Sequence, residues 1–284
     1  PAVPVQRGLR LGRISLEFAR DGNGRTYLGH QFASYPFHVC KVQYQDGDCP
    51  NLATLYVQSC SGGLYEDDRH RLELRVKSGA EAHFTTQAST IVHSMPAGQA
   101  RQDARITAES DAYLEYLPDP HILFPRSSFA SAIRIVMAPG ATVLVSDSVM
   151  THDPHGLGGL PNFYRSEIVI EDGDGRTLAI DRLRLDTPAF KARAPGILGA
   201  FNAHVTLVVA TRDPLAVTIH AAGCGGFGFD YEDAAIGVSV LPNSAGLVFR
   251  VLAKDGAMLK RTMHACWSAA RLALKGSVPV ARRK

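Results

Sequence analysis

Short apolar runs separated by Gly, Asp, Asn or Pro dominate the hydrophobic pattern of this chain. Residues 72–76 (LELRV) alternate between apolar and charged side chains, which is typical of a strand with one buried face and one wet face. Similar runs rich in Val, Ile, Leu and aromatic residues occur at 14–18, 53–58, 112–116, 133–137, 142–145, 205–210 and 247–252. The pattern therefore predicts a protein built mainly of β-strands.

A weak repeat runs through residues 71–86, 104–119 and 132–147. Each unit reads as a strand, a tight turn and a second strand that ends in polar residues. The turns at Gly79, Asp111 and Gly140 are each followed by Ala and recur roughly every thirty residues. Stacked units would bury a continuous core, as in a solenoid or layered sheet. The alternative is that ordinary antiparallel hairpins repeat the same pattern.

Helical periodicity is clearest at Gly256–Lys275, where Leu259, Met263, Cys266, Trp267, Ala270 and Leu274 follow the three/four spacing of one face. Asp255 is a suitable N-cap, and Gly276 is a suitable stop. We therefore expect an all-β fold with a few short helices. Its strands are stacked or layered in a β-helix-like arrangement, and a helix at about 256–275 lies near the C-terminus. Residues 1–284 are expected to form one domain, with a basic, solvated tail at 276–284.

Composition narrows the functional classes. The 284 residues carry a formal net charge of +3, which is too mild to indicate nucleic-acid binding. No run of about 18 apolar residues predicts a membrane span, and residues 1–13 lack the apolar region of a signal peptide. The five cysteines are odd in number and form no C-x-x-C motif, which disfavours a disulfide framework and fits a reducing compartment. A cytoplasmic location is expected.

Motifs for catalysis are missing, whereas two sets of residues could meet a metal ion. The sequence holds no G-x-S-x-G elbow and no P-loop lysine and serine. His152 and His155 flank Asp153 in one loop, although their spacing matches no standard zinc pattern and a solvated loop is the competing interpretation. The second set consists of oxygen-bearing residues that end the repeat units: Thr85, Thr86, Glu115, Asp119 and Asp147.

If the units stack, these oxygen-bearing residues converge on one edge. A row of hard oxygen ligands along a water-filled path could pass a hydrated divalent cation without trapping it, because multiple weak sites conduct ions that tight sites hold. Two alternatives remain open on the residues alone. Strand ends are often polar because they meet solvent, and a pair of carboxylates could serve glycosidase chemistry.

Several segments resemble a known family when they are taken in order: 61–64 (SGGL) with 67–69 (DDR), 79–80 (GA) with 85–90 (TTQAST), 114–120 (LEYLPDP), 124–129 (FPRSSF), 181–185 (DRLRL) and 246–251 (GLVFRV), followed by the helix that bears Trp267 and Arg271. Their order and spacing, from about residue 11 to 283, resemble the UreD (UreH) family of urease accessory proteins. The chain departs from that pattern at Ile91, where a lysine is usual, and at Ser166-Glu167, where Gly-Glu is usual.

The resemblance implies a β-rich, layered, non-enzymatic protein. It implies binding to apo-urease and to UreF, which recruits the GTPase UreG with its nickel, and a water-filled tunnel that guides nickel to urease. Nickel would be in transit, with no tightly bound cofactor. On this view the residues expected to line the path are Thr85, Thr86, Glu115, Asp119, Asp147 and Glu167, with His152 and His155 as weaker metal candidates.

Two other functions compete with this interpretation. One is a β-solenoid carbohydrate-active enzyme that uses the strand-end carboxylates. It is disfavoured because the single tryptophan, Trp267, lies on a predicted core helix and offers no sugar-stacking platform. The other is a general β-rich interaction scaffold unrelated to urease.

Overall fold

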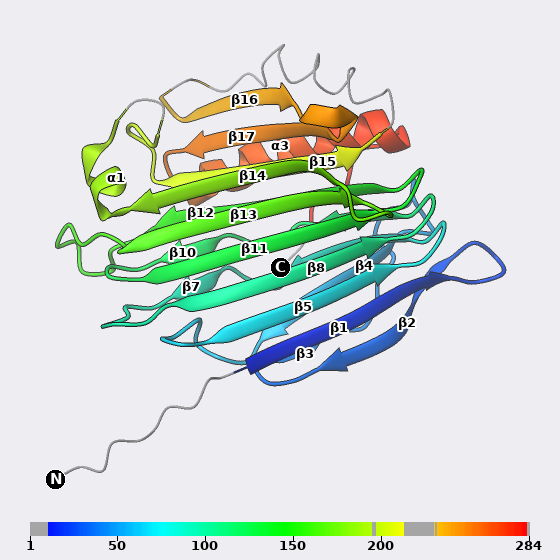
Figure 1. Ribbon diagram of the computed structural model, residues 1–284, viewed down its shortest axis with the longest axis horizontal. Helices are drawn as coiled ribbons and strands as arrows, with labels where there is room; N and C mark the ends of the chain where they lie inside the picture. The colour runs from blue at the N-terminus through cyan, green and yellow to red at the C-terminus, as the bar shows by residue number, and fades with distance from the viewer. Residues whose placement is uncertain (1–10, 195–196, 213–229, 231, 283–284) are drawn as a thin grey trace, which may run out of the picture.

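The computed structural model describes residues 11–194, 197–212, 230 and 232–282, and these form two stacked β-sheets (Figure 1). Sheet A has the order β14-β13-β11-β8-β5-β1-β2, and sheet B has the order β16-β17-β15-β12-β9-β6-β4-β3. Two short strands, β7 and β10, pair with each other, and β10 also pairs with β12. The predicted fold class, mainly β with stacked strands and a C-terminal helix, is confirmed.

The strands of sheet A are β1 (Leu11–Arg20), β2 (Thr26–Ala33), β5 (Arg69–Val76), β8 (Ala100–Ala108), β11 (Ser128–Met137), β13 (Phe163–Asp172) and β14 (Thr177–Asp186). Those of sheet B are β3 (Phe37–Val39), β4 (Ala53–Ser59), β6 (Glu81–Thr86), β7 (Thr90–Val92), β9 (Tyr113–Tyr116), β10 (His121–Leu123), β12 (Thr142–Thr151), β15 (Ala203–Thr211), β16 (Ala234–Val240) and β17 (Gly246–Ala253). The helices are α1 (Thr187–Ala192), the 3-10 turn η1 (Pro242–Ser244) and α3 (Gly256–Lys275).

The three repeat units stack as coils of a solenoid. Each unit gives its first strand to sheet A and its second to sheet B: β5 and β6, β8 and β9, β11 and β12. Equivalent strands pair in parallel and in register, so Leu72, Ala104 and Ile133 lie side by side. The hairpin alternative is wrong, because the two strands of a unit do not pair with each other. Gly79, Asp111 and Gly140 all have positive φ, which explains why each turn carries Gly or Asp.

Helix α3 covers the outer face of sheet B. Its bounds match the prediction: the Asp255 side chain accepts a hydrogen bond from the Met258 N–H, and Gly276 ends the helix in the left-handed conformation. Leu259, Cys266, Trp267 and Ala270 pack with strand residues such as Phe249 into one apolar cluster. Central strands of sheet B, such as β12 and β15, are therefore buried on both faces. No helix among the described residues is long and apolar enough to cross a membrane.

The C-terminal tail differs from its expected solvated state. Val280 and Arg282 both bind the buried side chain of Asp46, so the described part of the tail packs against the protein. Arg283 and Lys284 lie outside the described residues, as does Cys224. The other four cysteines are free thiols.

Gly246 offers a test of the strand packing at β17. A Cβ added there would lie 1.9 Å from the Val209 carbonyl oxygen, at a φ of +119°. We expect Gly246→Ala to lower the free energy of unfolding by roughly 2 kcal/mol or more, through backbone strain and displacement of β15. Gly237→Ala in neighbouring β16 is the control, because its added Cβ meets nothing within 4 Å. Urea denaturation of both variants, followed by circular dichroism, measures the difference, and equal losses would contradict the prediction.

Candidate functional site

A layer of polar side chains crosses the space between the two sheets. Sheet A contributes His70, Gln102, Ser131 and Ser166, which lie in register on adjacent strands. Sheet B contributes Asp147, Thr206 and Arg250, which are likewise in register. We call these seven residues the interior polar layer.

Apolar clusters bound the interior polar layer on both sides. On β13, Tyr164 and Ile168 flank Ser166 and belong to two different clusters. On β12, Val145 and Val149 flank Asp147 in the same way. A buried polar group is unfavourable unless it is hydrogen-bonded, so a polar layer between two apolar clusters does not serve packing alone.

Hydrogen bonds join the interior polar layer across the sheets. The Ser166 hydroxyl donates to Asp147 Oδ2 over 2.6 Å, which links sheet A to sheet B. Arg250 donates to Thr206 Oγ1 and forms an ion pair with Asp181 of β14 at the far end. The Nδ1 atom of buried His204, which lies beside this layer on β15, has no hydrogen-bond partner in the described structure. This nitrogen beside the layer is therefore available to bind water or a cation.

The histidines in and beside this layer are uncharged at neutral pH. Burial, followed by the nearby His121, lowers the pKa of His70 to about 4. Burial, followed by the Arg250 charge, likewise lowers the pKa of His204 to about 4. Burial also lowers the pKa of His121. Neutral imidazoles neither repel a cation nor lose their ability to ligate one.

A cavity of about 360 Å³ opens at the β1–β4 side of the interior polar layer. His70, Gln102 and His121 line its inner part, together with Thr86 and Asp119. Its remaining wall includes the backbone-rich segment 59–63 and residues 87–91. The cavity therefore joins the interior polar layer to a loop-lined edge of the protein.

The structure divides the residues predicted to line a path into three groups. Thr86 and Asp119 line this cavity, and Asp147 belongs to the interior polar layer. Thr85 and Glu115 point to the other face of sheet B, toward α3. Glu167 lies on the outer face of sheet A, where it pairs with exposed Arg182. The expected convergence of the whole set on one edge is therefore wrong, because neighbouring strand positions face opposite sides.

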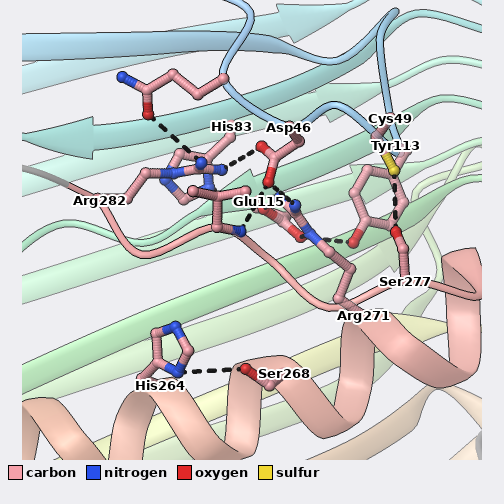
Figure 2. Close-up of polar contacts among 12 residues, drawn as sticks. Asp46, Cys49, His83, Tyr113, Glu115, His264, Ser268, Arg271, Ser277 and Arg282 are labelled. Atoms are coloured by element: carbon pink, nitrogen blue, oxygen red, sulfur yellow. Dashed lines mark hydrogen bonds and ion pairs between the residues drawn. The ribbon is translucent and has the colours of Figure 1, made fainter.

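Glu115 is the centre of a buried ion cluster beneath α3 (Figure 2). Arg271 donates two hydrogen bonds to its carboxylate, over 2.7 and 2.5 Å. Tyr113 and the Nδ1 of His83 also hydrogen-bond to it, over 2.7 and 2.8 Å. A third nitrogen of Arg271 binds Asp46, 2.7 Å away. The side chains of Arg271 and Glu115 are both fully buried, so this pair anchors α3 to sheet B.

The charges of this cluster are fixed by their partners. Burial opposes ionisation of Glu115, but hydrogen bonds from His83 and Arg271 and the Arg271 charge outweigh it, so its pKa lies well below the usual range. Burial lowers the pKa of His83 to about 4 despite its bond to Glu115. His83 is therefore neutral and donates its Nδ1–H, while Arg271 supplies the compensating charge.

A second cavity, of about 450 Å³, lies between α3 and sheet B. Thr85, His83 and Trp267 line it, and the His83 Nε2 and Trp267 Nε1 atoms have no hydrogen-bond partner among the described residues. Segments 87–89 and 118–119 line both cavities and separate them.

The predicted histidine loop stands apart from both cavities. His152 and His155 are exposed, and His152 lies near the Phe124 ring. Across the described ranges, no three His, Cys, Asp or Glu side chains are grouped closely enough to hold a metal ion.

Sequence reasoning missed His70, His121, Asp46 and Arg271. His70 lies two residues before Leu72, in phase with the apolar positions Leu72, Leu74 and Val76 of the same strand, and this phase is a signal that could have found the first. The helix held a comparable signal, since Arg271 lies one turn after Trp267 on the apolar face.

The family match and the similar proteins all point to the same family. Residues 10–284 match the family described as UreD urease accessory protein. Similar proteins named urease accessory protein UreD 1 occur in Pseudomonas syringae pv. syringae (strain B728a), at 36% identity over 95% of this chain and 94% of the relative, and in Methylorubrum extorquens (strain PA1), at 40% identity over 100% and 94%. A protein named urease accessory protein UreD from Haloarcula marismortui is 33% identical over 96% and 90%.

Arg271→Met should strand the buried Glu115 charge and lower the free energy of unfolding by about 3–5 kcal/mol. Adding Glu115→Gln should restore part of that loss, because the remaining partner is no longer charged. Urea denaturation of the two single variants and the double variant measures this coupling. Arg182→Met is the control, since its pair with Glu167 is exposed and should contribute less than about 1 kcal/mol. A loss below 1 kcal/mol for Arg271→Met would contradict the anchoring role.

Acid should destabilise the protein between pH 6.5 and pH 4. His70, His83 and His204 have a pKa of about 4 when folded, and about 6.5 is expected when they are unfolded. The unfolded chain therefore binds more protons in this window. The free energy of unfolding has its full value above pH 6.5 and falls as the pH drops toward 4. Each histidine should contribute on the order of 1 kcal/mol per pH unit. Urea denaturation at a series of pH values tests this, and His83→Gln should reduce the slope.

Proposed function

This chain belongs to the UreD family of urease accessory proteins, and from that premise we propose that it is a non-enzymatic scaffold for nickel delivery to apo-urease. It binds apo-urease and UreF in the cytoplasm, and UreF brings the GTPase UreG with its nickel. The proposal rests on family membership, established over residues 10–284.

We further propose that nickel crosses this protein along the interior polar layer. The observation that carries this proposal is the buried Asp147 carboxylate, held between two apolar clusters in the same polar layer as His70 and Gln102, which line a cavity of about 360 Å³. Thr86 and Asp119 line the entrance, and Asp147 lies farther in. The predicted roles of these three residues are retained in this proposal.

The chemistry of these groups suits passage more than storage. Hydroxyl and carboxylate oxygens hold nickel less tightly than a cage of imidazoles or thiolates does. His70 and His121 add neutral nitrogen ligands, one at a time, along the cavity wall. A series of weak, separate sites lets an ion enter and leave.

The competing interpretations receive no support from the arrangement. Of the carboxylates considered for glycosidase chemistry, Glu115 is locked by Arg271 on the α3 face of sheet B, whereas Asp147 faces the space between the sheets. Trp267, the only tryptophan, is buried between α3 and sheet B. A scaffold unrelated to urease is contradicted by the family match.

Asp147→Asn tests the path, because it removes the charge and keeps an oxygen for the Ser166 hydrogen bond. We expect the nickel content of co-expressed urease to fall several-fold while the urease–accessory complex still copurifies. Nickel is measured by atomic absorption on purified urease. Glu115 is unsuitable for this test, since its substitution disturbs the α3 anchor.

Glu167→Gln is the matched control for charge removal. Its side chain lies on the outer face of sheet A, so urease should receive its normal nickel. Normal nickel content with Asp147→Asn, in an intact complex, would refute the interior route. Loss of the complex itself would instead place Asp147 among residues needed for assembly.

A further inference from the structure

The two sheets differ in what covers them. Helix α3 packs against β15, β16 and β17 of sheet B. No described helix lies over the outer face of sheet A, which Figure 1 presents toward the viewer as a broad array of strands. The outward side chains of six of its strands are therefore free to meet another molecule.

Two adjacent rows on this face are rich in arginine. The first row crosses the sheet in register as Arg69, Arg101, Ala130, Arg165 and Arg184. The second runs alongside as Arg13, Arg71, Asp103, Ala132, Glu167 and Arg182. We call these the arginine rows. They hold seven arginines against two carboxylates, whereas the whole chain has a formal net charge of only +3.

This arrangement does not favour the isolated sheet. Arg69 lies directly opposite Arg101, and Arg165 lies directly opposite Arg184. Like charges at such positions destabilise a sheet by roughly 0.2–1 kcal/mol per pair. A solvated sheet face would be more stable with alternating signs, so the rows meet a requirement other than folding.

Only some of the arginines in these rows form ion pairs within the protein. Arg101 pairs with Asp103, Arg182 with Glu167, and Arg184 with Asp186 at 3.7 Å. These pairs are exposed and contribute little stability, so each arginine can replace its carboxylate partner by a carboxylate of another molecule. Among the described residues, no carboxylate lies within ion-pair distance of four further arginines: Arg13, Arg69, Arg71 and Arg165.

The surface also has the shape of a binding site. A depression of about 320 Å³ lies on this face, and its charged lining residues are four arginines and three carboxylates: Arg71, Arg101, Arg105, Arg134, Glu73, Asp103 and Glu167. The small side chains of Ala130 and Ala132 on β11 lie between Arg101 of β8 and Arg165 of β13. The first row spans five strands, or roughly 19 Å at the usual strand spacing, which matches an extended segment of about six residues.

We propose that the arginine rows are the docking surface for an extended acidic segment of a partner protein. Guanidinium groups bind carboxylates with two parallel hydrogen bonds, which gives geometry as well as attraction. Asp103 and Glu167 disfavour a polyphosphate chain, whereas a peptide can place a neutral or basic residue beside them. This inference goes beyond nickel delivery and does not depend on the interior route.

Binding of a fluorescein-labelled octaglutamate peptide to the full-length protein tests the proposal by fluorescence anisotropy. We expect Arg165→Ser with Arg184→Ser to weaken binding roughly tenfold or more, with a strong dependence on salt. Arg165→Lys with Arg184→Lys keeps the charge but loses the two parallel hydrogen bonds, so it should weaken binding less than the serine pair does. Arg13→Ser with Arg71→Ser provides a second, independent loss variant in the neighbouring row.

Lys260→Ser with Arg261→Ser is the matched control. It removes the same charge from the exposed side of α3, and we expect a change of no more than about twofold. Circular dichroism verifies that each variant is folded. Equal losses in row and control variants would overturn the proposal in favour of general attraction to a basic chain. Tighter binding of an oligothymidine of equal charge would overturn it in favour of nucleic acid. The assay contains no nickel, so failure of the interior route leaves its result unchanged.

Discussion

Parallel, in-register stacking of the coils is the constraint on which this structure depends. Because each coil places equivalent residues beside those of the next coil, a residue type that recurs at one position becomes a row across the sheet. Apolar residues in such rows form the core between the sheets. Polar residues at one inward position form the interior polar layer, and arginines at outward positions form the arginine rows. One geometric rule therefore produces both the proposed route and the proposed docking surface.

The buried ion cluster under α3 gives the protein its two unlike sides. Arg271 and Glu115 have fully buried side chains and come from elements 156 residues apart in sequence, so their pairing fixes the helix on the outer face of sheet B. A buried pair of this kind contributes little net stability, but its loss is costly, which favours a single position for the helix. Asp46 extends the same anchor to the tail through Arg282. Sheet B is thereby closed by the protein itself, and sheet A remains open.

This sidedness suits a scaffold that handles a metal ion and a protein partner at once. The groups proposed to meet nickel lie between the sheets and along the adjoining cavity, where neutral histidines lie with the carboxylates of Asp119 and Asp147. The groups proposed to meet a partner lie on the outside of sheet A, where charges are exposed and exchange readily. Family membership in UreD places both surfaces in the context of urease maturation.

The sequence by itself determined many of the strands, the repeat units, the C-terminal helix with both caps, and the family, but the pattern left stacked coils and hairpins as alternatives. These features depend on local spacing, turn conformation and ordered motifs, all of which a single chain displays. It also named Thr86, Asp119 and Asp147 as candidates to line a path, but it could not separate them from Glu115 and Glu167. The reason is the burial of sheet B on both faces: residues 142–149 are buried at every position, so alternation is erased and the facing of Asp147 is hidden. Only tertiary structure decided which side each carboxylate faces, because the partners that fix Glu115 and Glu167 come from other strands and from a helix at the far end of the chain.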